Sequence, residues 1–223
     1  MNHHRCAAII VCAALLSIGA HAQEVSLAAP FTILPTQRLV KDFLADESAH
    51  QFAASRVFEN GDASVGLGGV VPLVELSVLQ YPLQVSTGAS VHARLDPDRS
   101  ISVQSVEFTI DFFLIDIAWS RDLRTRTGLG HTSHHLGDGL PDSVVAGVID
   151  YSRDYVVFTI VRTLPEVGGQ AYGGVNYAYG LVVGRPLDKP LTGQFGFSAS
   201  APLTAVLSLY GGVDLKFRQD LSY

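Results

Sequence analysis

Hydrophobic and polar residues alternate at every second position along most of the chain after residue 50. In the segment "SVEFTIDF", residues 105–112, an apolar residue stands at each even-numbered position and a polar residue at most of the others. A two-residue period is typical of β-strands, because successive side chains point to opposite faces of a sheet. The apolar side changes after this segment, which predicts a bulge or tight turn near residues 112–114.

About ten such strands follow one another, separated by residues that favour turns. Strand patterns cover segments such as "QVSTGASVHAR" and "TGQFGFSAS", and also roughly 63–79, 144–151, 155–163, 170–184 and 203–218. The predicted turns include Asp96-Pro97-Asp98, Ser152-Arg153-Asp154 and Pro165-Glu166. The pattern predicts an all-β, antiparallel fold.

Residues 23–50 differ from the strands that follow. After the Leu34-Pro35 break, Leu39, Val40, Phe43 and Leu44 stand at helical spacing. This predicts a short helix or an irregular, plug-like lead-in on the periplasmic side of the fold. A plain N-terminal tail is the alternative.

The first 22 residues have the features of a secretory signal peptide. Arg5 supplies a positive charge, residues 6–20 are almost all apolar, and Ala20-His21-Ala22 fits a cleavage site. We therefore expect three regions: a signal peptide at 1–22, a lead-in at 23–50 and a β-barrel domain at 51–223. Both cysteines lie in the signal, so disulfides are not expected in the secreted chain.

Composition favours a membrane-embedded form of this β fold. The chain is 48% hydrophobic, yet after the signal no apolar run approaches the roughly 20 residues of a membrane helix. A transmembrane β-barrel spreads its lipid-facing residues over alternate positions. Polar strand faces suit a wet lumen, and an interfacial aromatic girdle is predicted from residues near strand ends: Tyr81, Trp119, Tyr151, Tyr155 and Tyr210.

We therefore predict an outer-membrane β-barrel whose partner is outer-membrane lipid. At about ten strands the interior is narrow and filled by side chains, so a general porin is not expected. His92 and Arg94 would line that interior. The arginines of the 121–126 segment could line it, bind lipid phosphate or lie on a solvated strand face with paired charges. A net charge of −6 and the lack of a basic cluster disfavour nucleic-acid binding. A soluble periplasmic β-sandwich binding protein is the alternative.

The densest polar motif is "GLGHTSHHLGDG" at residues 128–139. On a strand, His131 and Ser133 would share one face, as the base and nucleophile of an ester hydrolase do. Asp138 would be the third, orienting residue, and Asp142 or Asp150 could serve instead. This hypothesis makes the protein a barrel-embedded lipid hydrolase with His131, Ser133 and Asp138 as catalytic residues.

Two other interpretations of this motif stay open. His131, His135 and Asp138 could ligate zinc, although their spacing matches no known ligand pattern. The interpretation that we favour is a hydrogen-bonded network of structural importance at a strand end, without catalysis. The sequence predicts no cofactor, since no glycine pair opens a helix as a phosphate loop does.

"GHTSHHLGD" resembles the signature His-x-Ser-Ser-His-Leu-Gly-Asp-Glu of a bacterial outer-membrane family, domain of unknown function number 1207. "ILPTQRLVKDFLADESAHQFAAS", "QVSTGASVHARLD", "QAYGGVNYAYG" and "GGVDLKFRQDLSY" are similar to other stretches of that family. The resemblance implies an outer-membrane barrel and no particular reaction. The motif is also similar to the His-x-Ser-Asn of two outer-membrane lipid hydrolases, phospholipase A and the lipid A 3-O-deacylase.

The chain departs from the family signature at two positions. His134 replaces its second serine and Gly139 replaces its last acidic residue, so roles that need those groups are in doubt. The family also continues past the "DLKFRQDLSY" stretch. A C-terminal truncation, with a total of about twelve strands in the complete barrel, is therefore expected. The aromatic final residue, Tyr223, is the feature that favours a barrel ending here.

Overall fold

The computed structural model describes residues 31–46, 49–56, 63–96, 102–137, 151–183, 190–204 and 207–218. The predicted signal peptide and the strand predicted at 144–150 lie outside these residues. Within them the chain is almost entirely β-structure, and the only helical element is a 3-10 turn at Pro165–Val167. The predicted all-β, antiparallel fold is confirmed.

Ten strands make up the described sheet. They are β1 (Phe31–Ile33), β2 (Ala53–Arg56), β3 (Ala63–Val78), β4 (Tyr81–Asp96), β5 (Ser102–Ala118), β6 (Leu123–Leu136), β7 (Tyr151–Leu164), β8 (Gly169–Val183), β9 (Leu191–Pro202) and β10 (Ser208–Arg218).

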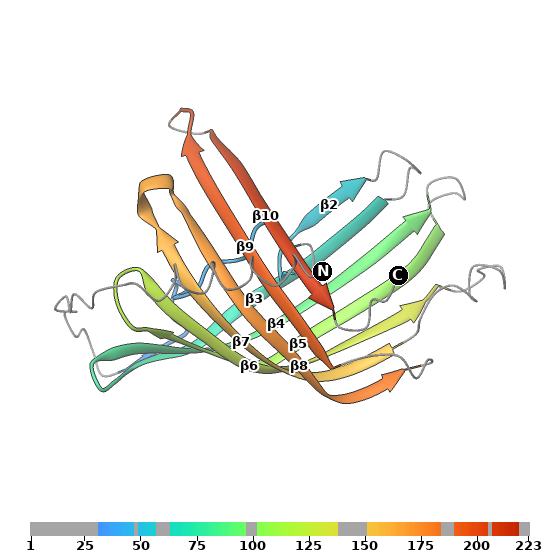
Figure 1. Ribbon diagram of the computed structural model, residues 1–223, viewed down its shortest axis with the longest axis horizontal. Coiled ribbons are helices and arrows are strands. Elements are labelled where there is room, and N and C mark those ends of the chain that lie inside the picture. Colours follow the sequence, from blue (N-terminus) through green and yellow to red (C-terminus); the bar gives the residue numbers. More distant parts are fainter. Residues whose placement is uncertain are drawn as a thin grey trace, which may run out of the picture.

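From β3 to β10 each strand pairs antiparallel with the next strand in the sequence. The short strands β1 and β2 pair with opposite ends of β3. The sheet is strongly curved and wraps around the segment that joins β1 to β2 (Figure 1). Among the described residues β3 and β10 do not pair, so the sheet is not closed.

Strand registers confirm some predicted irregularities and correct others. The ladder between β5 and β6 shifts between Asp111 and Phe113, where the alternation predicted a bulge. The predicted turn at Pro165-Glu166 is the 3-10 turn. The turn predicted at 152–154 is wrong, because these residues lie inside β7 and pair with β6. The three polar residues favour a turn locally, but their pairing with β6 stabilises the extended conformation.

The sheet has two faces of opposite character. The inner face contacts the segment between β1 and β2, and many of its side chains are polar and buried, such as Gln84, Asp111 and Asp116. On each strand, the residues that alternate with these inner-face residues form the outer face. It exposes large apolar side chains on most strands, including Leu67, Phe108, Ile110, Phe158, Val175, Phe197 and Val213.

The residues that the sequence predicted as an aromatic girdle lie on different faces of the sheet. Tyr81 and Trp119 pack together at the adjoining ends of β4 and β5, with ring centroids 5.2 Å apart. Tyr155 is buried on the inner face, where it bonds Asp111, and Tyr151 lines the same side. A girdle of lipid-facing residues would have to lie on the outer face, so these two tyrosines do not belong to one. Strand-end position alone does not fix the side of the sheet.

The two ends of the sheet carry different connections. Residues 79–80, 119–122, 165–168 and 203–207 join strands at one end, which we call the turn end. Leu79 and Gln80 both have positive φ, as a two-residue hairpin turn requires. The connections at the other end, the loop end, include residues 137–150 between β6 and β7. β1 lies at the turn end and β2 at the loop end.

Candidate functional site

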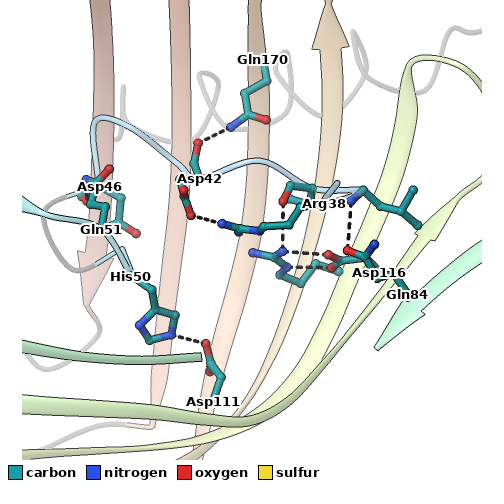
Figure 2. A network of polar contacts seen from close by, with 12 residues as sticks. Arg38, Asp42, Asp46, His50, Gln51, Gln84, Asp111, Asp116 and Gln170 are labelled. Atoms are coloured by element: carbon teal, nitrogen blue, oxygen red, sulfur yellow. Dashed lines mark hydrogen bonds and ion pairs between the residues drawn. The ribbon is translucent and has the colours of Figure 1, made fainter. Parts of the chain in front are cut away.

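The segment between β1 and β2 crosses the inner face from the turn end to the loop end. We call it the crossing segment (described residues 34–46 and 49–52). It contains turns and bends but no helix, so the helix predicted around residues 39–44 is wrong. The plug-like form that the sequence also predicted is what the structure shows. The crossing segment bonds to sheet side chains (Figure 2), and these contacts take the place of a helical ladder.

Gln84 on β4 holds the start of the crossing segment. Its amide oxygen accepts a hydrogen bond from the backbone N–H of Leu39 at 3.1 Å. Its amide nitrogen donates to the backbone oxygen of Gln37 at 2.8 Å and to the Glu75 carboxylate at 2.9 Å. Gln84 is completely buried. One side chain therefore satisfies two backbone groups that a buried, irregular segment would otherwise leave without partners.

A buried ion pair lies beneath the middle of the crossing segment. Arg126 on β6 donates from Nε and Nη2 to the two carboxylate oxygens of Asp116 on β5, both at 2.8 Å. Asp116 is completely buried, and the geometry is the bidentate one that makes such pairs strong. Arg126 also approaches the backbone oxygen of Val40 at 3.5 Å and lies 5.9 Å from the Phe43 ring centre.

The apolar contacts of the crossing segment are few and central. Phe43 stacks on Tyr172 of β8 with ring centroids 3.9 Å apart. Val40 and Val161 complete this buried cluster. Tyr172 in turn donates a hydrogen bond to Asp214 on β10 at 2.6 Å. The small cluster thus fixes the crossing segment to the second half of the sheet.

His50 anchors the crossing segment near the loop end. Its Nε2 lies 2.6 Å from the carboxylate of Asp111, whose other oxygen accepts a hydrogen bond from Tyr155 at 2.8 Å. The imidazole packs against the backbone of β4 at Gly88, where an added Cβ would lie 2.5 Å from the ring. Only glycine leaves room for this close approach.

Asp46 ties the crossing segment to the last two strands. Lys216 of β10 donates to one carboxylate oxygen at 2.6 Å, and Gln194 of β9 donates to the other at 2.8 Å. Nearby, Gln170 of β8 donates to the backbone oxygen of Asp42 at 2.8 Å (Figure 2). The crossing segment is therefore bonded to strands from β4 to β10.

A cavity of about 650 Å³ lies beside the crossing segment on the inner face. The crossing segment and the sheet both line it. The charged and polar residues that the sheet contributes include Glu107, Asp111, Arg126, His134 and Lys216. Tyr151 donates a hydrogen bond to Glu107 across the cavity wall. His92 and Arg94 also line it, as the sequence predicted for an interior-facing pair. Apolar side chains such as Phe43, Leu114 and Val157 also line the cavity, so its wall is of mixed character.

The histidine-rich motif of β6 is divided between the two faces. Thr132 and His134 point to the inner face and line the cavity, where His134 stacks on Tyr151 with ring centroids 5.3 Å apart. His131, Ser133 and His135 alternate with them and therefore lie on the outer face. Asp138, Asp142 and Asp150 lie outside the described residues.

The structure brings His131 together with a different carboxylate from those that the sequence proposed. Asp154 of β7 stands opposite His131 in the strand register, and its Oδ1 lies 2.7 Å from His131 Nδ1. Ser133 stands opposite Ser152 and forms no hydrogen bond with His131 within the described part of the chain. His135 packs edge-on against Phe108, with ring centroids 6.0 Å apart.

Sequence reasoning missed several of these polar residues. Because Asp154 belongs to the turn predicted at residues 152–154, the sequence pattern does not indicate that it lies beside His131. Asp111 and Asp116 occur on the polar side of a strongly apolar strand, and this position was a signal that they face a polar interior. The structure does not support the zinc hypothesis with a set of ligands. The described residues contain no group of three histidine, cysteine or acidic side chains able to hold a metal.

Comparisons of the chain with protein-family models, with curated proteins and with solved structures gave no match. In the described part of the chain, no helix is both long and apolar enough to cross a membrane.

Proposed function

We propose that this chain forms the wall of an outer-membrane β-barrel whose interior is occupied by its own crossing segment. The observation that carries the proposal is the inverted polarity of the sheet. The inner face buries Gln84, Ser86 and Asp116 completely. The outer face leaves Phe112 56% exposed and Phe217 58% exposed.

Lipid as the solvent of the outer face accounts for this inversion. Exposed phenylalanine and valine side chains cost free energy in water, by about 25 cal/mol per Å² of apolar surface, and none in hydrocarbon. The strands from β3 to β8 are 14–17 residues long. A tilted membrane strand needs only about 9–11 residues, so each of these strands is long enough to span.

The polar inner face argues against the soluble β-sandwich alternative. A sandwich buries the apolar faces of two sheets against each other. Here the buried face carries an ion pair, glutamines and carboxylates, and only a small apolar cluster around Phe43.

The specific role that we propose is structural rather than that of a general pore. In the proposed barrel the crossing segment would occupy the space through which solutes pass. Hydrogen bonds to β4, β6, β8, β9 and β10 hold it there. A plugged barrel of this kind would be a stable, poorly conducting component of the outer membrane.

Membrane fractionation tests this proposal. The full chain, expressed with its own N-terminus, should sediment with outer membranes, resist carbonate extraction and migrate differently on gels before and after boiling. Reconstituted in planar bilayers, it should give far lower conductance than an open porin measured in parallel. Recovery in the soluble periplasmic fraction would contradict the membrane assignment, and porin-like conductance would contradict the plugged interior.

A further inference from the structure

One polar patch interrupts the apolar outer face. His131, Ser133 and His135 of β6 lie beside Ser152 and Asp154 of β7, close to the loop end of both strands. Their outer-face neighbours on β5 are Val106, Phe108 and Ile110. In the proposed barrel these five polar side chains would face lipid, where polar groups are costly and often mark a functional site.

The contact between His131 and Asp154 fixes the proton arrangement of the imidazole. A carboxylate accepts hydrogen bonds only, so the Nδ1 atom that lies 2.7 Å from Asp154 carries the hydrogen. In the neutral ring, Nε2 is then the nitrogen with the free lone pair. An orienting carboxylate on Nδ1 and a basic Nε2 are the two properties that a hydrolase histidine needs.

Ser133 supplies a hydroxyl on the same face of the same strand. Residues two apart on a strand are separated by about 7 Å along the chain, and an imidazole can lean across most of that distance. The His131 side chain is one-third exposed, so substrate can reach it from outside. Substrate binding often brings base and nucleophile of such sites into hydrogen-bond geometry.

We propose that Ser133, His131 and Asp154 form an acyl-ester hydrolase site that acts on membrane lipid. Ser133 is the nucleophile, His131 the general base and acid, and Asp154 a positioning residue that acts through His131. The substrate assignment rests on the proposed membrane placement of the outer face. The hydrolytic chemistry itself does not depend on that placement.

The reaction has two balanced steps. In the first, the Ser133 hydroxyl gives its proton to His131 Nε2 and Oγ bonds to the ester carbonyl carbon. The bond to the alcohol oxygen then breaks, and that oxygen takes the proton from His131. In the second, water gives a proton to His131 and its oxygen attacks the acyl carbon, which releases the fatty acid and returns the proton to Ser133.

The strand register also supplies a donor for the transition state. Ser152 stands directly opposite Ser133, and its hydroxyl belongs to the same outer face. The carbonyl oxygen of an ester gains negative charge during attack, and a hydroxyl donor near it lowers the barrier. We assign that oxyanion-stabilising role to Ser152.

The surroundings of the site point to a lipid acyl ester as the substrate. Phe108 and Ile110 stand opposite Ser133 and His131 on one side, and both are more than 40% exposed. Val156 follows Asp154 on the other side. These apolar side chains suit an alkyl chain lying along the strands. The site lies near the loop end, and in such barrels the longer loops face the cell exterior, which places it in the outer leaflet.

Two measurements on the full chain in mixed micelles test the chemistry. A fluorophosphonate probe should form a covalent adduct that mass spectrometry locates on Ser133. Fatty acid should be released from phospholipid vesicles, from lipopolysaccharide, or from both, and these two substrates, assayed separately, distinguish the source of the ester. Ser133→Ala and His131→Gln should each abolish both signals.

Asp154→Asn tests the positioning role. By comparison with other Ser-His-Asp sites, we expect the rate of fatty acid release to fall by about 10⁴-fold, with a changed pH–rate profile. A purely structural carboxylate would not alter that profile. Thr127→Val is the matched control, because it removes an outer-face hydroxyl from the same strand away from the site, and it should leave the rate unchanged.

The outcomes separate this inference from the proposed barrel. No adduct and no fatty acid from a wild-type protein that does resist carbonate extraction would overturn the hydrolase and leave the barrel intact. Adduct formation and cleavage of a short-chain soluble ester by a protein found in the soluble fraction would overturn the barrel and the lipid substrate, but not the catalytic residues.

Discussion

Asp116 is a charged residue that the fold removes completely from water. It is completely buried, and Arg126 is its bidentate partner. Removing two charges from water costs several kcal/mol for each ion, and their attraction repays that cost only when both are present. The pair therefore contributes little to stability as a unit, whereas the loss of either member leaves an uncompensated buried charge.

A double-mutant cycle at this pair gives a measurable consequence. We expect Asp116→Leu and Arg126→Met each to lower the free energy of unfolding by about 3–5 kcal/mol. The double variant should lose much less than the sum of the two. Urea unfolding in detergent micelles, followed by fluorescence of the single tryptophan, Trp119, measures all four proteins. Additive losses would contradict the account of a compensated pair.

At the scale of elements, the crossing segment depends on a close approach to β4. His50 packs where an added Cβ at Gly88 would stand 2.5 Å from the ring, whereas an added Cβ at Gly69 on β3 would meet no atom within 4 Å. The first glycine is required by contact with the crossing segment, and the second is not. The two positions therefore make a matched pair for substitution.

We expect Gly88→Ala to displace His50 from Asp111 and to loosen the crossing segment, while Gly69→Ala has little effect. Limited trypsin digestion at Lys41 measures this, because cleavage of a transiently open segment follows the population of its open form. Faster cleavage of the Gly88 variant alone is the expected result. Equal rates for both variants would show that His50 does not hold the segment.

Periodicity predicted most of the described strands, since burial on one side of a sheet imposes a period of two. The bulge at Asp111 and Phe113 and the interior position of His92 were predictable for the same reason. The helical spacing at residues 39–44 was misleading because Val40 and Phe43 pack onto one sheet face from an irregular backbone. Asp154 could not be assigned to His131, because the register depends on the geometry of a long connection.

At the scale of the whole molecule, adjacent residues of one strand face two different environments. On β7, Val156 is 37% exposed on the outer face, and Val157 lines the inner cavity. The same substitution at both positions therefore compares those environments directly. A lipid-facing lysine near the middle of the bilayer costs about 2–4 kcal/mol, whereas an inner lysine meets carboxylates and a polar cavity.

Val156→Lys should accordingly reduce membrane assembly more than Val157→Lys. The fraction of heat-modifiable, carbonate-resistant protein measures assembly for both variants. A soluble sheet would give the reverse order, because its outer residue would be in water and its inner residue in the core. The sign of the difference therefore distinguishes lipid from water as the outer solvent.

The bond between Asp46 and Lys216 joins residues 170 positions apart. Asp46 precedes most of the strands in the sequence and its partner lies in β10, so this contact forms only after the intervening strands have paired. Loop closure over such a distance is slow, and proteins dominated by non-local contacts fold slowly. The crossing segment is synthesised before most of the strands, but it can dock completely only after the last strand has paired. Its docking is therefore the final step in the assembly of this fold.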